Sequence, residues 1–473
     1  MKISSKKDNK FNVAKTGLIY LISTILIKGI IFITMPLFTK ILTVQAFGIY
    51  NAYMSYEGTI SIAFALGGVL AIRNARIEYE TSFEKFKSSL FYLEFFVFIV
   101  TLCIAVLLKK QLSAILGMDE SIVLCLVIHS FGSALITLTG EIWRVNYKAN
   151  KVLILSLIIT ASNIMLSLFF IHFIFIEKMH VGRILGSAIP AILFIFAVFI
   201  RYLFLNRKMV SRTYWAYILK LGIPGLPYIL SENLLVQSDR IMIERYVGAY
   251  QAGIYSAIST IASILLIVEG GLNSAWEPWL YRTLSDEKEL LVKQYTNLYV
   301  GLGGILTIGF SMIAPELIQI FTGRMDYLKF AYIIYPLIGV QYFNFLCKVS
   351  NNLQFFFKKA IFPSIGICGC AAFNIFLNYF LLQHYPFVVT SMTSLCAIIM
   401  FCIYNFIMTK IFRYNNYYNL WALVFESLLT ASIVLFNYYF INNILIRYLF
   451  TTVVSIVIGF LLYIFYKQKD YIK

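Results

Sequence analysis

Charged residues are scarce in this chain. Asp, Glu, Lys and Arg together make up 13% of its 473 residues, whereas a soluble domain carries about 25%. Hydrophobic residues make up 60%. This composition excludes an ordinary soluble protein and indicates an integral membrane protein. The net charge of +17 then belongs first to cytoplasmic loops, where Lys and Arg accumulate, and is no sign of nucleic-acid binding.

Paired cysteines, extramembrane domains and nucleotide-binding motifs are also missing. The seven cysteines lie in or beside apolar runs, and their odd number argues against a disulfide framework. Cys368 and Cys370 have no further Cys or His pair at metal-binding spacing, so we interpret them as packing residues. No connection between apolar runs is long enough for a catalytic domain, and no GxxxxGKS or GxxxxGKT loop is present. We therefore predict that the protein is not an enzyme.

Apolar runs long enough to cross a ~30 Å hydrocarbon core repeat along the chain. They predict an all-α integral membrane protein with about 14 transmembrane helices. Both termini are predicted to be cytoplasmic, because most Lys and Arg residues then fall on the cytoplasmic side. Four prolines, Pro190, Pro224, Pro227 and Pro363, are predicted to kink or break helices. The predicted spans are 14–38, 46–71, 88–108, 121–142, 152–176, 184–205, 221–244, 249–272, 294–314, 329–349, 361–382, 386–408, 421–441 and 447–466.

Two stretches in the two halves of the chain resemble each other. Lys40–Ala52 reads KILTVQAFGIYNA and Arg245–Ala257 reads RYVGAYQAGIYSA, and in both a GIYxA motif opens an apolar span. The alternative is chance similarity in a biased composition. Both copies enter the membrane from the same side, so we predict two six-helix lobes related as parallel repeats. The predicted domains are 1–205, 206–408 and, for two additional helices, 409–473.

The same residues carry a family resemblance. The stretches MPLFTKILTVQAFGIYNAY (35–53) and LGIPGLPYILSENLLVQSDRIMIERYVGAYQAGIYSA (221–257) resemble bacterial polysaccharide flippases of the Wzx type. The resemblance implies the multidrug/oligosaccharidyl-lipid/polysaccharide exporter superfamily, which includes MATE drug exporters and the lipid II flippase. It further implies alternating access in the cytoplasmic (inner) membrane. The implied substrate is an undecaprenyl-pyrophosphate-linked oligosaccharide, the O-antigen or capsule repeat unit.

That resemblance also sets expectations about partners. Besides the lipid-linked oligosaccharide and the bilayer, it suggests a polysaccharide polymerase and a chain-length regulator as partners. No nucleic acid and no cofactor are expected, with H⁺ or Na⁺ as the coupling ion.

Cations within spans are the first candidates for meeting an anionic headgroup. Lys28 lies at the middle of the first span, where a lysine costs roughly 3 kcal/mol, so we expect it to face a central cavity rather than lipid. The alternative is a lysine that snorkels to a headgroup. Asn233 aligns with Lys28 in the repeat and is predicted to line the same cavity. Arg73 and Lys348 lie near cytoplasmic ends and fit either substrate binding or a positive-inside anchor.

Charges near the outer end of the seventh span suggest a gate. Asp239, Arg240 and Glu244 share one side of a helix, and Arg245 follows directly. Ion pairs between them would open as the lobes move. The alternative is a solvated helix end.

Carboxylates and tryptophans within spans remain open to two interpretations each. Glu57 is predicted to line the cavity, where it would pair with Lys28 or carry a coupling proton. For Glu94, Glu141 and Glu269 we expect an interhelical pairing or interface position instead. Trp276 and its neighbours, in AWEPWLYR, fit an interfacial belt better than a sugar-binding surface.

The leading function is therefore a flippase for lipid-linked oligosaccharide. The alternative is a cation-coupled, MATE-like multidrug antiporter, which would need an acidic cavity for cationic drugs; Lys28 has the wrong sign for it. A membrane glycosyltransferase or polymerase would need a sizeable outer loop, which the sequence lacks.

Overall fold

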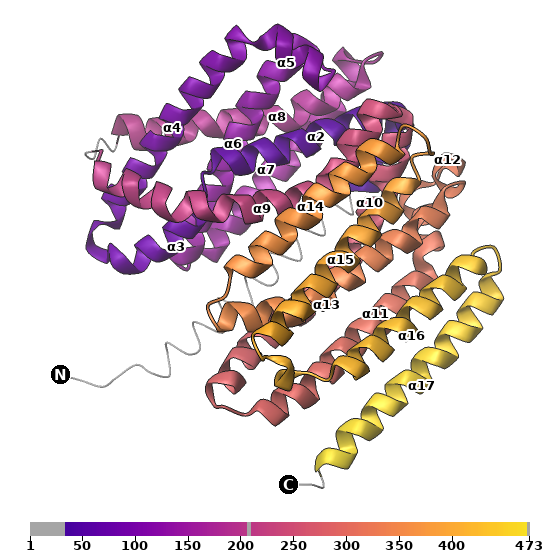
Figure 1. Cartoon of the computed structure of the whole chain (residues 1–473). Coiled ribbons are helices and arrows are strands. Elements are labelled where there is room, and N and C mark those ends of the chain that lie inside the picture. Colours follow the sequence, from indigo (N-terminus) through magenta and orange to yellow (C-terminus); the bar gives the residue numbers. More distant parts are fainter. Residues whose placement is uncertain (1–33, 206–209, 471–473) are drawn as a thin grey trace. The chain divides into compact units, whose positions relative to one another are not determined.

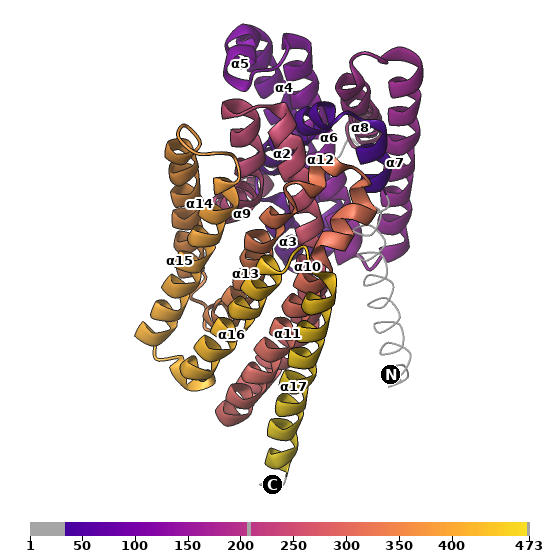
Figure 2. The ribbon, with the colours of Figure 1, turned by 90° about the vertical axis from the view of Figure 1, so that its right-hand side faces the viewer.

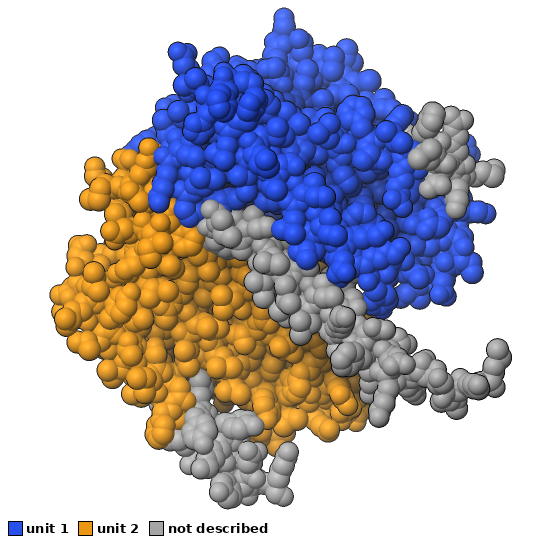
Figure 3. Space-filling view, turned by 180° about the vertical axis from the view of Figure 1, so that it is seen from behind, with its two compact units in different colours: residues 1–252 blue, residues 253–473 orange. Residues whose placement is uncertain are grey.

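The structure, a computed structural model, describes residues 34–205 and 210–470 (Figure 1). All regular elements in these residues are helices. The chain divides into two compact units, residues 1–252 and 253–473, which Figure 3 colours separately. The boundary falls in the first turn of α10. The predicted boundaries at 205/206 and 408/409 stay predictions.

The described part of unit 1 begins with a helical stretch over residues 34–41. The labelled helices up to α9 follow it. They are α2 (Val44–Phe64), α3 (Gly68–Glu78), η1 (Glu80–Ser82), α4 (Phe83–Leu107), α5 (Lys109–Leu116), α6 (Glu120–Val145), α7 (Ala149–Phe169), η2 (Phe170–Ile174), α8 (Met179–Val198), η3 (Phe199–Leu205) and α9 (Arg212–Tyr246).

Unit 2 holds the remaining helices. They are α10 (Ala249–Ser285), α11 (Glu289–Thr322), α12 (Met325–Leu328), η4 (Ala331–Ile333), α13 (Ile334–Phe356), α14 (Ile361–Leu381), α15 (Val389–Ile411), η5 (Asn415–Tyr417), α16 (Leu420–Tyr439) and α17 (Ile444–Asp470).

The predicted spans correspond closely to these helices. Every predicted range from 46–71 onward overlaps a helix, and the first span, 14–38, lies mostly outside the described residues. The count of 14 spans stays a prediction. Ten helical stretches among the described residues are long and apolar enough to cross a membrane, which makes this a multi-pass membrane protein. Of the prolines predicted to kink or break helices, Pro190 lies inside α8, and α9 runs through both Pro224 and Pro227 without ending.

One predicted span is divided in two. Between α2 and α3, Leu66 and Gly67 both have positive φ angles, of 45° and 67°. The backbone at this break touches α9, because a Cβ atom on Gly222 would lie 1.9 Å from the Leu66 carbonyl oxygen. A Cβ atom on Gly67 would lie 2.4 Å from the Gly222 Cα. Only glycine at both positions permits this approach.

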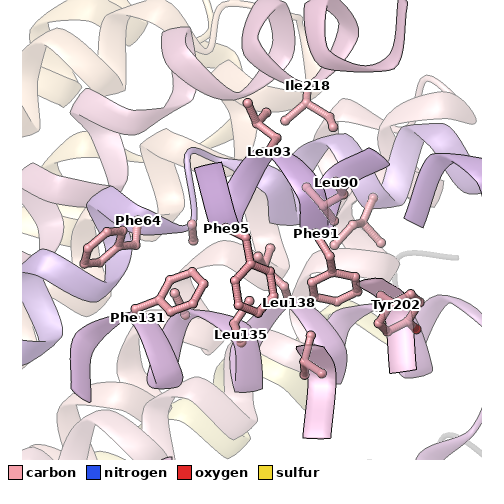
Figure 4. Close-up of a cluster of buried hydrophobic side chains, with 14 of the residues drawn as sticks. Phe64, Leu90, Phe91, Leu93, Phe95, Phe131, Leu135, Leu138, Tyr202 and Ile218 are labelled. Atoms are coloured by element: carbon pink, nitrogen blue, oxygen red, sulfur yellow. The ribbon is translucent and has the colours of Figure 1, made fainter. Parts of the chain in front are cut away.

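The core of unit 1 is a cluster of aromatic and aliphatic side chains (Figure 4). Phe131 of α6 packs against three other rings, with its ring centroid 4.1 Å from that of Phe98, 5.2 Å from that of Phe95 and 5.6 Å from that of Phe64. This packing joins α2, α4 and α6 by van der Waals contact, which is the main source of helix association inside a bilayer.

Small residues bring α7 and α8 together. A Cβ atom on Gly186 would lie 2.3 Å from the Ser167 Oγ, and one on Gly182 would lie 3.1 Å from the Ile171 nitrogen. The two glycines are four residues apart, so they form one strip along α8. This is the small-residue contact typical of membrane helices.

The two C-terminal helices, α16 and α17, lie beside α11 (Figure 2). Polar side chains connect them. Arg447 of α17 is fully buried and pairs with Glu316 of α11, and its Nη1 also donates to the Ile441 carbonyl oxygen at 3.0 Å. Asn437 of α16 donates to the Ser311 Oγ at 2.8 Å. The predicted additional helices therefore pack as an integral part of unit 2.

Arg447→Met is expected to lower the stability of the purified protein by about 2 kcal/mol or more, because it leaves the Glu316 carboxylate without its buried partner. A thermal melt in detergent measures this. The matched control is Arg413→Met, which removes an exposed arginine and should leave the melting temperature nearly unchanged. Equal melting temperatures for the two variants would show that the pair contributes nothing.

All seven cysteines are free, as the sequence predicts, and each lies within a helix. Cys103 and Cys396 are exposed on their helices, and the others are buried or half-buried.

Candidate functional site

Lys28, the cation predicted to face the cavity, lies outside the described residues. The other predicted site residues are all described. They belong to α2, α3 and α9 in unit 1 and to α13 in unit 2.

Glu57 is buried in α2, with 5% of its surface exposed. Its carboxyl group lies beside Ser133 of α6, and its Oε1 has no hydrogen-bond partner in the described part of the chain. A buried polar atom without a partner is uncommon and points to a function or a bound group.

Asn233 belongs to α9 and contacts the face of α2 that lies opposite to Glu57. Its Oδ1 accepts a hydrogen bond from Thr59 of α2 at 3.2 Å, and one turn away Ser55 donates to the Gln237 Oε1 at 3.1 Å. Ser55 and Thr59 share a helix face, and Glu57 lies roughly opposite to it. The structure thus places Asn233 in a polar α2–α9 seam and directs Glu57 toward α6, so unit 1 does not bring these two predicted residues together.

Arg73 forms an ion pair between α3 and α6. Its Nε lies 2.6 Å from the Oε1 of Glu141, and the Nη1 of Arg144 lies 3.3 Å from the Oε2 of the same carboxylate. Glu141 is nearly buried, whereas both arginine side chains are more than half exposed. The interhelical pairing predicted for Glu141 is confirmed. Two arginines thus share one carboxylate.

The four predicted gate residues lie in the last turns of α9. Asp239 is buried, and Arg240 and Glu244 are half-buried. Arg245 is exposed, and its Nη2 donates to the Ala114 carbonyl oxygen of α5 at 3.1 Å. Arg245 thus contacts the end of α5, where helix carbonyl groups lack partners within the helix. A gating role for the four residues stays a prediction.

Lys348 belongs to a polar cluster in unit 2, which we call the α10–α11–α13 cluster. It consists of Glu269 and Asn273 of α10, Tyr299 and Thr307 of α11, and Lys348 and Asn352 of α13. Glu269 is fully buried, interacts electrostatically with Lys348 and accepts a hydrogen bond from Thr307 at 3.4 Å. The Asn273 Oδ1 accepts hydrogen bonds from the Tyr299 hydroxyl at 3.1 Å and from the Asn352 Nδ2 at 3.2 Å. The interhelical position predicted for Glu269 is confirmed.

Sequence reasoning found only part of this cluster. Glu269 and Asn273 are four residues apart, and so are Lys348 and Asn352, which places each pair on one helix face. This repeated spacing is a signal that Asn273 and Asn352 belong to the cluster. Nothing in the sequence identifies Tyr299 as their partner.

Trp276 lies beside the cluster and inside the protein. Its ring stacks on Tyr299 at 4.5 Å, and 8% of its surface is exposed. The belt interpretation is therefore wrong for Trp276, because a belt residue lies at the protein surface. Among the described residues neither the Trp276 Nε1 nor the Glu269 Oε2 has a hydrogen-bond partner. The cluster thus presents one free donor and one free acceptor.

Glu94 has the interface position that we expect for it, without an ion pair among the described residues. It is fully buried in α4 beside the aromatic core, and neither of its carboxyl oxygens has a hydrogen-bond partner within residues 34–205 and 210–470. A Cβ atom on Gly68, at the start of α3, would lie 3.8 Å from its Oε1. Glu94 therefore sits at the α2–α3 break rather than opposite a cation.

Neither unit offers a conventional metal centre. Among the described residues no group of three or more His, Cys, Asp and Glu side chains could hold a metal ion. What the two units do offer is cationic and amide side chains on neighbouring helices. Such groups suit an anionic, hydroxyl-rich ligand.

A family profile described as "Polysaccharide biosynthesis protein" matches residues 13–284, which is more than half of the chain. The chain belongs to the polysaccharide biosynthesis protein family. No curated protein matches its sequence significantly.

Solved structures share the fold of this polysaccharide biosynthesis protein. The structure "Lipid II flippase MurJ, inward closed conformation" matches with a TM-score of 0.72 and 15% identity over 96% of this chain and 100% of that chain. An outward-facing MATE family multidrug resistance transporter matches with a TM-score of 0.54 and 12% identity over 85% of this chain and 94% of that one. A MOP superfamily transporter from Pyrococcus furiosus, described as having a binding pocket of reverse polarity, matches with a TM-score of 0.54 and 11% identity over 89% of this chain and 96% of that one.

The family match and the shared fold agree with the predicted exporter superfamily. The all-helical membrane fold is confirmed. The matching structures are those of a flippase and of transporters, which agrees with the prediction of a transport protein rather than an enzyme.

Proposed function

We propose that this protein flips undecaprenyl-pyrophosphate-linked oligosaccharides, such as O-antigen or capsule repeat units, from the inner to the outer leaflet of the cytoplasmic membrane. The observation that carries the proposal is the combination of a polysaccharide biosynthesis sequence with the fold of a lipid II flippase. Such a substrate keeps its lipid tail in the bilayer, but its headgroup must cross a region where polar groups lack water.

The charges of both units support an anionic substrate. In unit 1, the Arg73 side chain is more than half exposed although it pairs with Glu141, so its guanidinium can still meet a phosphate. An arginine fork can bind two phosphate oxygens at once. We propose that Arg73 meets the pyrophosphate at the cytoplasmic side.

The polar groups of unit 2 support a sugar-bearing headgroup. The α10–α11–α13 cluster offers amide, hydroxyl, carboxyl and ammonium groups, together with the free Trp276 Nε1 and Glu269 Oε2. Hydroxyl groups of a sugar can both donate and accept, so they can satisfy both free atoms. Glu57 and Glu269 are the carboxyl groups that we propose for coupling transport to H⁺ or Na⁺.

Deletion of the gene tests the proposal. Loss of surface polysaccharide, with accumulation of lipid-linked repeat units on the inner leaflet, is the expected result. Lys348→Ala should fail to restore the polymer, whereas Lys410→Ala, which removes an exposed lysine from the end of α15, should restore it. Normal polymer in the deletion strain without lipid-linked accumulation would contradict the proposal. Drug resistance on overexpression would favour the antiporter.

A further inference from the structure

Arg183 is a buried cation that the transport proposal does not use. It lies in the second turn of α8, with 7% of its surface exposed. Its guanidinium is packed against two aromatic rings, at 3.8 Å from the Phe38 centroid and 4.4 Å from the Tyr50 centroid. Cation–π contact of this kind stabilises an arginine but leaves its charge in place.

All hydrogen bonds that Arg183 forms with described residues are made by its Nη1, so the Nε and Nη2 have no partner among them. The Nη1 donates to the Ser167 Oγ at 2.7 Å and to the Asn163 Oδ1, both on α7. The Nε is buried and has no hydrogen-bond partner in the described part of the chain. None of the ion pairs found among the described residues includes Arg183.

A buried charge without a counter-ion is costly, at about several kcal/mol even after relaxation. Phe38 and Tyr50 pack against the flat faces of the guanidinium. A further partner must therefore approach its edge, within the plane of the group. The Nε and Nη2 together form the edge that binds two oxygens of one anion.

We propose that Arg183 is a phosphate-binding site, in which Nε and Nη2 donate to two oxygens of a phosphate ester or pyrophosphate. Phosphate fits better than a carboxylate of the chain, because α8 begins only four residues before Arg183 and a membrane supplies phosphate groups at helix ends. The positive end of the α8 dipole adds to the attraction.

The phosphate could come from a bilayer phospholipid or from a polyprenyl-pyrophosphate-linked substrate. The chemistry is the same in both cases. The phosphate site does not depend on the proposed transport function, because bilayer phospholipid is available to it whatever the protein transports. Only the second source would connect it to transport.

Lipid titration followed by native mass spectrometry tests the site on the purified, delipidated full-length protein. The probes are phosphatidylglycerol, undecaprenyl pyrophosphate and, as a phosphate-free lipid, diacylglycerol. Arg183→Gln should weaken binding of a phosphate-bearing lipid by about tenfold, the equivalent of one charge-assisted hydrogen bond, and leave diacylglycerol binding unchanged. Arg183→Lys, which keeps the charge but not the fork, should weaken it less.

The matched control is Lys178→Gln, which removes an exposed positive charge just before α8. It should change binding of either phosphate lipid less than twofold, on the order expected for a screened surface charge. A loss confined to undecaprenyl pyrophosphate assigns the site to the substrate, and a loss confined to phosphatidylglycerol assigns it to the bilayer. No loss for either lipid in folded Arg183→Gln overturns the proposal.

If Arg183→Gln does not fold, a cross-linking experiment on the wild-type protein still tests the proposal. A phosphatidylglycerol carrying a photoreactive group beside its phosphate, and a matching undecaprenyl pyrophosphate probe, should cross-link peptides that contain Tyr50 or residues 163–183. An excess of the unlabelled phosphate lipid should suppress these cross-links, and diacylglycerol should not. Cross-links elsewhere only, or equal competition by diacylglycerol, would refute a phosphate site at Arg183.

Discussion

Gly222→Ala is expected to abolish accumulation of the folded protein. The added methyl group would lie 1.9 Å from the Leu66 carbonyl oxygen, and its other close neighbour, at 3.2 Å, is the Gly67 backbone. Backbone atoms cannot rotate away as a side chain can, so α9 must separate from the α2–α3 break. We expect a loss of about 3 kcal/mol or more, the upper range for overpacking. Size-exclusion chromatography of a fluorescent fusion measures the folded yield.

Gly140→Ala is the matched control for this substitution. Gly140 also lies within a helix of unit 1, but a Cβ atom there would have nothing within 4 Å. Alanine in that position should be neutral or stabilising by up to about 1 kcal/mol, because glycine disfavours a helix interior. If Gly222→Ala accumulates as well as Gly140→Ala, the close approach of α9 to the break is not essential for folding.

Separate replacement of Glu269 and Lys348 by alanine is expected to remove most transport activity. Glu269 is fully buried, and the ammonium of Lys348 is the opposite charge that acts on it. Lys348→Ala removes the ammonium that acts on the buried Glu269 carboxylate, and Glu269→Ala removes that carboxylate from the cluster. Restoration of surface polysaccharide in a deletion strain, normalised to protein level in the membrane, measures the effect.

The double variant that exchanges the two residues, Glu269→Lys with Lys348→Glu, distinguishes two explanations. Either the two charges act mainly on each other, or one of them is required at its own position. Recovery of activity relative to the single variants would show that the two charges act mainly on each other. If the exchanged pair stays inactive at normal protein level, the ammonium is required at position 348 itself, as expected for a residue that contacts the substrate. Wild-type activity in either single alanine variant would remove both residues from the proposed site.

Helix positions were predictable because a membrane imposes one simple length rule. A run of apolar residues must be long enough to cross the hydrocarbon core, and the chain separates such runs by short polar segments. The break between α2 and α3 did not follow from that rule. Gly67 and Gly68 lie inside an apolar run, and their effect depends on Gly222, a residue far away in the sequence that comes into contact only in the fold.

The candidate sites were less predictable, because charge spacing along one helix does not name the partner on another. The pair between Arg73 and Glu141 joins two helices that the sequence gives no reason to pair. Nothing in the sequence distinguishes Arg183 from an ordinary loop cation, since only the fold brings Phe38 and Tyr50 against it. Trp276 fits an interfacial belt by residue type, and the competing packing on Tyr299 is a tertiary contact.

The confinement of all seven native thiols to helices has a practical consequence. A reagent that reacts with sulfhydryls but does not enter lipid should find little to modify in the wild-type chain. A single cysteine introduced into a connecting segment, such as at Lys178 or Lys358, would then be modified in intact cells only if that segment lies on the outer side of the membrane. The unmodified protein is thus already a suitable starting point for mapping its own orientation.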